Sequence, residues 1–328
     1  MISVEVKNGS LLDVQNLNVT YKSTMFHVDA VKDVSITMNK GECIAIVGES
    51  GSGKSTLAMA VMKLLPPYAT VTADKIMFNG VDILKVSDKE LAKIRGKDVT
   101  VIFQDPISYL NPIISVGDQM IESLSSHNDK ITKKEAYEQA IDLLKKVRIA
   151  DPERILKMYP FQLSGGMAQR VFIAMAVSAN PKLLIADEPT TALDLTIQAQ
   201  ILKLLNSLRK EFNLSIMLIT HDLGLASYIA DRIYVMFNGK VVEEDLAEGI
   251  FSQPVHPYTQ MLIASSQAIY HGRTRELSKT ISDMGKMEKG KKACDFADRC
   301  DKSSEACYNE PQLVKYDGTK KVRCWLVE

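Results

Sequence analysis

Residues 44–56 read IAIVGESGSGKST, and this stretch indicates the fold class. The apolar run IAIV is typical of a buried strand, and the spacing Gly48-x4-Gly53-Lys54-Ser55 fits a phosphate-binding P-loop that opens into a helix. Glycines let backbone N–H groups turn inward around an anion, and the helix start adds about half a positive charge. Because the loop follows a strand and precedes a helix, a phosphate-binding loop is a better interpretation than a plain glycine turn.

The side chains of this loop are expected to hold a nucleotide. Lys54 is expected to reach the β- and γ-phosphates, while the Ser55 hydroxyl is expected to ligate Mg²⁺. The predicted nucleotide-binding set of the loop is Gly48, Ser50, Gly51, Gly53, Lys54, Ser55 and Thr56.

An acidic pair follows a second buried strand, KLLIAD at 182–187. Ligands of open α/β sheets bind at the carboxyl ends of strands. We therefore expect Asp187 to hold Mg²⁺ and Glu188 to polarise the attacking water as general base. Alone, such a pair is more often a solvated turn, and the P-loop reverses that preference. His221, after the strand LSIMLIT, is a candidate for contact with the γ-phosphate, although a histidine there is often structural.

Strands alternate with helices along the chain, which predicts an α/β fold with a mostly parallel core sheet. Half-buried strands at 11–21 and 33–38 predict an antiparallel N-terminal β subdomain. The amphipathic stretch 131–147, with Thr132 and Glu135 as a capping box, predicts a helix within an inserted helical subdomain over about 105–180.

We expect a nucleotide-binding domain over residues 1–253 and a C-terminal extension over 254–328. RIYVMF and KVVEE, on either side of Asn238-Gly239, predict a hairpin. The polar, lysine-rich stretch 270–293 predicts a linker.

Composition limits the function classes. The 328 residues are 46% apolar, and forty basic residues balance forty acidic ones, so bulk nucleic-acid binding is not expected. The N-terminus shows no secretory signal and no apolar run approaches a membrane span, so a cytosolic chain is expected. Cys294, Cys300, Cys307 and Cys324 crowd the last 35 residues, and a reducing compartment argues against structural disulfides.

The motifs GESGSGKST, LSGGMAQR (163–170), LLIADEP, TTALD and THD occur here in the order of a known family. Over about residues 11–253 the chain resembles the ATP-binding subunit of an ABC transporter. The resemblance implies that Tyr21 stacks on adenine, with a strand-core tyrosine as an equal alternative. It implies that Gln104 senses Mg²⁺ and faces a membrane subunit, with an ordinary loop glutamine as the alternative. His221 becomes the switch histidine.

The resemblance also assigns the second glycine pair of the chain. Ser164, Gly165 and Gly166 match the signature loop, and Asp194 matches a loop that communicates across the dimer. In this family two ATPase domains face each other head to tail, so each ATP lies between one P-loop and the partner's signature loop. Ala168 departs from the basic residue usual at its position, and closure of the dimer is expected to survive this change.

Three further stretches resemble the ATPases of oligopeptide and dipeptide importers: residues 102–112, 187–202 and HPYT at 256–259. His256 is interpreted as structural. Membership would imply ATP and Mg²⁺ as ligands, a peripheral position on the cytoplasmic face of the membrane, two permeases, a paralogous second ATPase and, indirectly, an extracellular solute-binding protein.

The four tail cysteines resemble an extension that holds a [4Fe–4S] cluster in some members of this branch. Their spacing, C-x5-C-x6-C-x16-C, is weak support by itself. Zinc and four free thiols remain as alternatives, with the cluster preferred.

Three other functions stay open at this point. A nickel or metallophore importer uses the same ATPase architecture, since this subunit does not contact the solute. A soluble ABC ATPase of translation or DNA repair usually adds coiled-coil arms or a second ATPase domain, and the sequence has neither. A binding module with a dead site conflicts with the intact Asp187-Glu188 pair.

Overall fold

The computed structural model describes residues 10–23, 26–126, 128, 130–191, 193–270 and 293–327. The described chain divides into two compact units. The helical unit contains Ser10, Asn39–Cys43 and Ile83–Ile219, and the P-loop unit contains Leu11–Met38, Ile44–Asp82 and the residues after Ile219. No helix among the described residues is long and apolar enough to cross a membrane. The predicted linker at 270–293 lies almost entirely outside the described residues.

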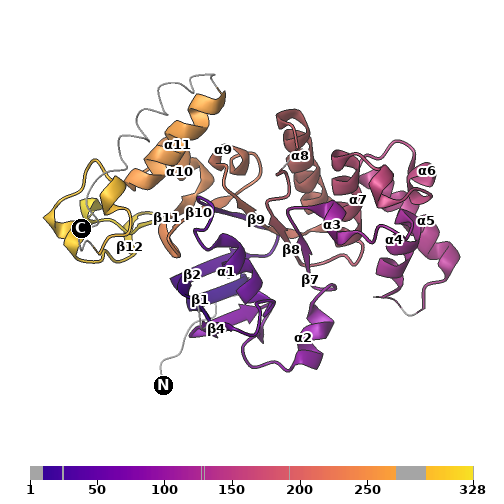
Figure 1. The fold of residues 1–328 in the computed structure, drawn as a ribbon, viewed down its shortest axis with the longest axis horizontal. Coiled ribbons are helices and arrows are strands. Elements are labelled where there is room, and N and C mark those ends of the chain that lie inside the picture. Colours follow the sequence, from indigo (N-terminus) through magenta and orange to yellow (C-terminus); the bar gives the residue numbers. More distant parts are fainter. Residues whose placement is uncertain are drawn as a thin grey trace. The chain divides into compact units, whose positions relative to one another are not determined.

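The P-loop unit contains two groups of strands and several short helices (Figure 1). Its strands are β1 (Ser10–Lys22), β2 (His27–Asn39), β3 (Cys43–Val47), β4 (Ala69–Thr72), β5 (Lys75–Phe78), β6 (Val81–Asp82), β10 (Arg232–Phe237), β11 (Lys240–Leu246), β12 (Val314–Asp317) and β13 (Lys320–Val322). Its helices are α1 (Lys54–Val61), α9 (Leu223–Ala226), α10 (Ala247–Ser252) and α11 (Pro257–Tyr270), with 3-10 turns η2 (Ala297–Arg299), η3 (Glu305–Tyr308) and η4 (Trp325–Val327).

The predicted N-terminal β subdomain is present as a sheet in the order β2-β1-β5-β6, with β4 also paired to β1. The pairs of β1 with β4 and β5 are antiparallel. Along β1 the buried positions change from Leu12 and Val14 to Leu17 and Val19. This change of phase occurs at Asn16, whose φ of 51° interrupts the two-residue alternation.

The P-loop follows β3, which pairs in parallel with β10. The predicted hairpin around Asn238 and Gly239 is confirmed by the antiparallel pairing of β10 with β11. A second hairpin, β12 and β13, joins this sheet through β11, in the order β12-β13-β11-β10-β3. The sequence pattern did not predict these last two strands, although Asp317-Gly318 at the end of β12 is a common hairpin signal.

A proline pair at positions 66 and 67 would stop a helix, yet α1 already ends at Val61. Lys63 adopts a left-handed conformation with φ of 49°. The Lys63 N–H donates to the Ala60 carbonyl, and the Leu64 N–H donates to the Met59 carbonyl. This is the Schellman pattern, which satisfies the last carbonyl groups of the helix and stops it before the prolines.

The helical unit combines a parallel sheet with a group of helices (Figure 1). Its strands are β7 (Val99–Ile102), β8 (Leu183–Asp187) and β9 (Ser215–Thr220), and both neighbouring pairs are parallel, as predicted for the core sheet. Its helices are α2 (Asp88–Ile94), α3 (Pro106–Tyr109), α4 (Val116–Ser125), α5 (Lys133–Lys146), α6 (Pro152–Leu156), α7 (Gly165–Val177) and α8 (Leu195–Phe212), with the 3-10 turn η1 (Pro160–Gln162).

Helices α4 to α7 pack against one another and form the predicted helical subdomain (Figure 1). The capping box at the start of α5 is confirmed: the Glu135 N–H donates to Thr132 Oγ1, and Thr132 N–H donates to the Glu135 carboxylate. The buried face of α5 carries Ala136, Ala140 and Leu144. The helix is therefore set by its own cap and by one apolar face.

Candidate functional site

The phosphate loop between β3 and α1 has the close backbone approaches that require glycine. A Cβ atom at Gly48 would lie 2.1 Å from the carbonyl oxygen of Met236. At Gly53, whose φ is 98°, it would lie 2.2 Å from the carbonyl oxygen of Ala30. Both neighbours are backbone atoms, so neither position accepts a side chain without moving the strand beside it. The tight packing of the loop against β10 and β2 therefore requires glycine at these two positions.

Two predicted nucleotide-binding side chains lie at this loop. Lys54 is buried, and its Nζ donates to the carbonyl oxygens of Gly48 and Glu49 at 2.8 Å each. The Tyr21 hydroxyl lies 3.2 Å from Thr56 Oγ1, so a strand of the N-terminal sheet reaches the first turn of α1. The tyrosine therefore lies beside the phosphate loop.

The predicted acidic pair lies at the end of β8, in the helical unit. Glu188 has a φ of 47°, an uncommon backbone conformation for a residue other than glycine. Its N–H donates to the carbonyl oxygen of Ile219 at 2.9 Å, and Thr191 Oγ1 donates to its Oε2 at 2.8 Å. Backbone strain of this kind is found at functional sites, where the surrounding structure holds it.

Gln104 is brought to the same sheet edge as Asp187. Strands β7 and β8 are parallel, with Ile102 opposite Ala186. Gln104 follows the end of β7 and is exposed. His221 follows β9, is also exposed, and belongs to the P-loop unit. The predicted metal-binding residues Gln104 and Asp187 thus share one edge of the helical unit, and Ser55 lies in the P-loop unit.

The signature loop forms one of two neighbouring capped helix starts in the helical unit. Ser164 Oγ accepts a hydrogen bond from the Met167 N–H at the start of α7, and Asp194 accepts one from the Ile197 N–H at the start of α8. A Cβ at Gly166 would lie 3.3 Å from the Ile197 side chain. The two helix starts therefore lie side by side, and both have the partial positive charge that favours an anion.

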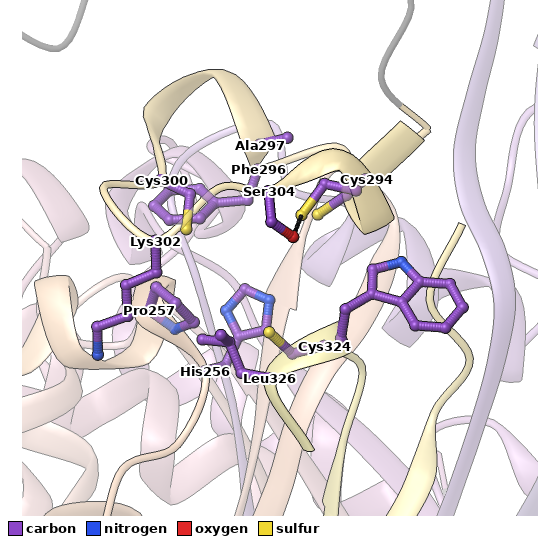
Figure 2. Close-up of a pocket in the computed structure, with 12 residues that line it drawn as sticks. His256, Pro257, Cys294, Phe296, Ala297, Cys300, Lys302, Ser304, Cys324 and Leu326 are labelled. Atoms are coloured by element: carbon purple, nitrogen blue, oxygen red, sulfur yellow. Dashed lines mark hydrogen bonds between the residues drawn. The ribbon is translucent and has the colours of Figure 1, made fainter. Parts of the chain in front are cut away.

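The four tail cysteines line one cavity in the P-loop unit. Figure 2 shows Cys294, Cys300 and Cys324 around this cavity with His256, and Cys307 also lines it. Burial raises the pKa values of the Cys294, Cys300 and Cys324 thiols. Within the described ranges, no group of three or more His, Cys, Asp or Glu side chains is arranged to hold a single metal ion.

His256, interpreted from the sequence as structural, is buried and lines this cavity. The ring Nδ1 of His256 accepts a hydrogen bond from the backbone N–H of Tyr258 at 3.1 Å. The backbone N–H of His256 donates to the Glu243 carboxylate. Burial lowers the pKa of His256 to about 4. The ring is therefore neutral at physiological pH and acts as an acceptor in the core.

The low pKa of His256 predicts a pH dependence of stability. Between its unfolded pKa of 6.5 and its folded pKa of about 4, the unfolded chain binds a proton that the folded chain does not, so stability falls as pH falls. From pH 7.5 to pH 5 the wild type should lose about 2 kcal/mol more than His256→Asn, which keeps an acceptor but no titrating ring. Urea unfolding of both proteins at the two pH values measures this. Equal losses would contradict the buried neutral histidine.

Comparison with known proteins gives matches over nearly the whole chain. The family model described as ABC transporter matches residues 31–191, and the one described as oligopeptide/dipeptide transporter, C-terminal region, matches residues 242–307. The oligopeptide transport ATP-binding protein OppD of Bacillus subtilis is 44% identical over 319 residues, covering 97% of this chain and 89% of OppD. The dipeptide transport ATP-binding protein DppD of Bacillus subtilis is 45% identical over 321 residues, covering 96% of this chain and 94% of DppD.

The fold of the chain is also similar to that of a solved structure. The ATP-binding cassette MJ0796, solved as a dimer bound to ADP and phosphate, has a TM-score of 0.64 at 30% identity, covering 72% of this chain and 98% of that one. Identity above 40% over nearly the whole length indicates common descent, so the chain belongs to the ATP-binding proteins of ABC transporters. Since the C-terminal region matches too, it is a member of their oligopeptide and dipeptide group. The expected family and fold class are confirmed.

Proposed function

We propose that this chain hydrolyses ATP to drive the import of peptides through membrane permeases. The observation that carries the proposal is the joint match of the ATPase core and the C-terminal region to oligopeptide and dipeptide transport ATP-binding proteins. The glycine-rich loop between β3 and α1, with the buried Lys54, also supports nucleotide binding. Nickel or metallophore import is the alternative within the same class.

The proposal gives each site residue the role that the matching motif has in this family. In this proposal the N–H groups of the loop and Lys54 bind the phosphates, and Tyr21 stacks on the base. Ser55, Asp187 and Gln104 would hold Mg²⁺, which when bound offsets the negative charge of the phosphates. Glu188 would accept the proton of the attacking water, and His221 would contact the γ-phosphate. A carboxylate at the end of a buried strand is well placed for such a base.

A second ATPase subunit would complete each site. The two adjacent helix starts capped by Ser164 and Asp194 offer an anion site, together with Gly165 and Gly166. We infer that they close over ATP held by the P-loop of a paralogous subunit. ATP would then join the two subunits, because its γ-phosphate contacts both only when they are closed.

This arrangement predicts the effect of a charge at the signature loop. Ser164→Asp keeps the helix cap but brings a carboxylate towards a triphosphate, so ATP-dependent association and turnover should fall by about tenfold or more. Ser164→Asn keeps both the cap and neutrality, and it should stay much nearer to the wild type. Size-exclusion chromatography with a non-hydrolysable ATP analogue and the partner ATPase measures the association. Equal association of both variants would contradict the composite site.

The helical unit supplies surface for a permease. Several large apolar side chains of α3, η1 and the segments beside them are exposed, with Ile113 at 82% and Phe161 at 70%. Exposed apolar side chains of this size are frequent at protein–protein contacts. We propose that they bind the permeases, which places the chain on the cytoplasmic face of the membrane, with a solute-binding protein acting from outside.

Transport by the reconstituted complex tests the whole proposal. The chain, its paralogous partner, both permeases and the solute-binding protein are placed in liposomes, and uptake of a labelled peptide and of Ni²⁺ is compared. ATP-dependent uptake of the peptide alone is expected. Uptake of Ni²⁺ alone would favour the alternative, and ATPase activity that needs neither permease would favour a soluble ABC ATPase.

We further propose that Cys294, Cys300, Cys307 and Cys324 hold a [4Fe–4S] cluster. The support is that all four cysteines line one cavity, and cysteine thiolates are the usual ligands of such clusters. Such a cluster would supply a covalent tie between the tail segments. Anaerobic purification should give brown, iron-containing protein, with iron lost in Cys300→Ser and kept in Cys43→Ala. Iron-free wild type would refute the cluster.

A further inference from the structure

The second residue of the phosphate loop, Glu49, is held by two side chains from the C-terminal part of the same unit. The Glu49 N–H donates to the Tyr258 hydroxyl at 2.9 Å. Its carboxylate accepts from both terminal nitrogens of Arg299, at 2.9 Å and 2.7 Å. Tyr258 lies 209 positions away in the sequence and Arg299 lies 250 away. Residues outside the loop therefore hold Glu49 both by its backbone N–H and by its carboxylate.

Arg299 is itself held in place. Its guanidinium carbon lies 5.7 Å from the ring centre of Phe237 and 5.5 Å from that of Phe296. Phe296 is buried and packs in turn against Tyr258, with ring centres 5.4 Å apart. A planar guanidinium between two rings and a carboxylate loses little freedom on pairing, so this bidentate contact is well defined.

The position of Arg299 also joins the loop to the cysteine cavity. Arg299 is the last residue of η2, and Cys300 follows it directly. Phe296 and Cys300, on either side of η2, both line the cavity (Figure 2). One short 3-10 turn thus contacts the phosphate loop with its arginine and the cysteine cavity with its flanking residues.

Glu49 carries a negative charge in a loop built to bind an anion. Its carbonyl oxygen accepts from Lys54 Nζ, the side chain expected to reach the phosphates. The hydrogen bonds from Arg299 hold the pKa of Glu49 below its usual range, so the carboxylate is ionised at neutral pH. Without Arg299, this charge would oppose the triphosphate and compete for Lys54.

We propose that Arg299 is a positioning residue of the nucleotide site, which neutralises Glu49 and keeps its carboxylate turned away from the phosphates. The inference rests on ATP binding at the P-loop, which is part of the proposed function. In this proposal the C-terminal extension controls the affinity for ATP through the ion pair of Arg299 with Glu49.

The test is a charge-rescue cycle at Arg299 and Glu49 in the purified complex. The variants are Arg299→Ala, Arg299→Lys, Glu49→Gln and the double variant Arg299→Ala/Glu49→Gln, with Lys315→Ala on exposed β12 as the matched control. Affinity is measured with a fluorescent ATP analogue, and KM and kcat by phosphate release. Circular dichroism of each variant checks the fold.

Arg299→Ala should raise the Kd and KM for ATP by about three- to tenfold, because the pair is partly exposed, with kcat within about twofold of wild type. Arg299→Lys should recover part of the loss, and the double variant should bind ATP as Glu49→Gln does. An unchanged Kd in Arg299→Ala would overturn the proposal. A double variant as weak as Arg299→Ala would overturn it too, since removing the carboxylate would then not help. A wild type that does not bind ATP would instead refute the proposed function.

Discussion

Glu188→Gln is expected to lower the turnover number for ATP by about 100-fold or more, while ATP binding and ATP-dependent association of the subunits persist. Glutamine has nearly the same shape, accepts the Thr191 hydrogen bond and meets the same backbone restriction at a φ of 47°. The substitution therefore removes the carboxylate and little else. Phosphate release at saturating ATP measures turnover, and size-exclusion chromatography measures association.

The matched control is Glu138→Gln, which neutralises an exposed carboxylate on α5 in the same unit. It should leave turnover unchanged. If Glu188→Gln turned over ATP at the wild-type rate, the assignment of the general base would be wrong.

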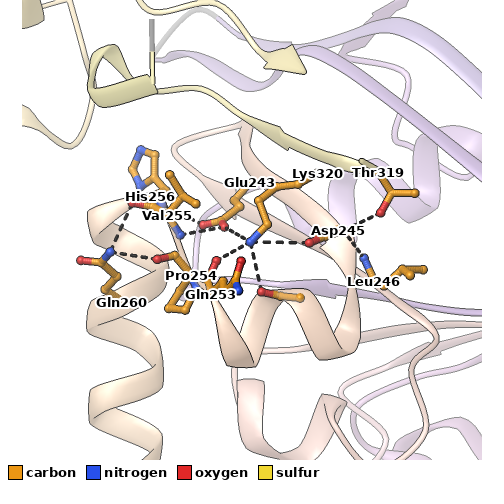
Figure 3. A network of polar contacts seen from close by, with 11 residues as sticks. Glu243, Asp245, Leu246, Gln253, Pro254, Val255, His256, Gln260, Thr319 and Lys320 are labelled. Atoms are coloured by element: carbon orange, nitrogen blue, oxygen red, sulfur yellow. Dashed lines mark hydrogen bonds and ion pairs between the residues drawn. The ribbon is translucent and has the colours of Figure 1, made fainter. Parts of the chain in front are cut away.

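Lys320→Met is expected to have the largest effect on stability. Figure 3 shows the Lys320 ammonium between the carboxylates of Glu243 and Asp245, where it also donates to the carbonyl oxygen of Gln253. The side chains are 6%, 0% and 9% exposed, so all three charges are buried. Removing the cation leaves two uncompensated carboxylates, and the free energy of unfolding should fall by about 3–5 kcal/mol.

Urea unfolding followed by the emission of Trp325 measures this loss, because Trp325 is the only tryptophan of the chain and lies in the C-terminal extension. Lys315→Met, on exposed β12, is the control and should change stability by less than about 0.5 kcal/mol. Adding Glu243→Gln to Lys320→Met should recover part of the loss. If Lys320→Met unfolded at the same urea concentration as the wild type, Lys320 would not be needed to stabilise the two buried carboxylates.

Loops, helix starts and turns that depend on residues close together in the sequence could be predicted from it. The P-loop spacing predicted the glycines at positions 48 and 53. In the structure a side chain at either position would meet a backbone carbonyl oxygen, on β10 or on β2. The Thr132 and Glu135 pair predicted the start of α5, and Asn238-Gly239 predicted the hairpin. Each depends on hydrogen bonds or backbone angles within a few residues, so the residue type is itself the signal.

Where prediction failed, contacts between distant segments were decisive. The buried Lys320 looked like one of many surface lysines in a polar tail, and its carboxylate partners lie on β11, about seventy-five positions earlier. Charged side chains in a sequence do not reveal whether they will be buried or with which partner.

The sequence by itself determined the class of this protein, because phosphate binding by backbone N–H groups needs a short, recognisable pattern of glycine, lysine and serine. Only the tertiary structure placed Arg299 on Glu49, 250 positions away, and seated the four tail cysteines around a cavity that His256 also lines. The physical reason is that an ion pair or a cavity forms wherever the packed core brings side chains together, and that proximity leaves no local mark in the chain.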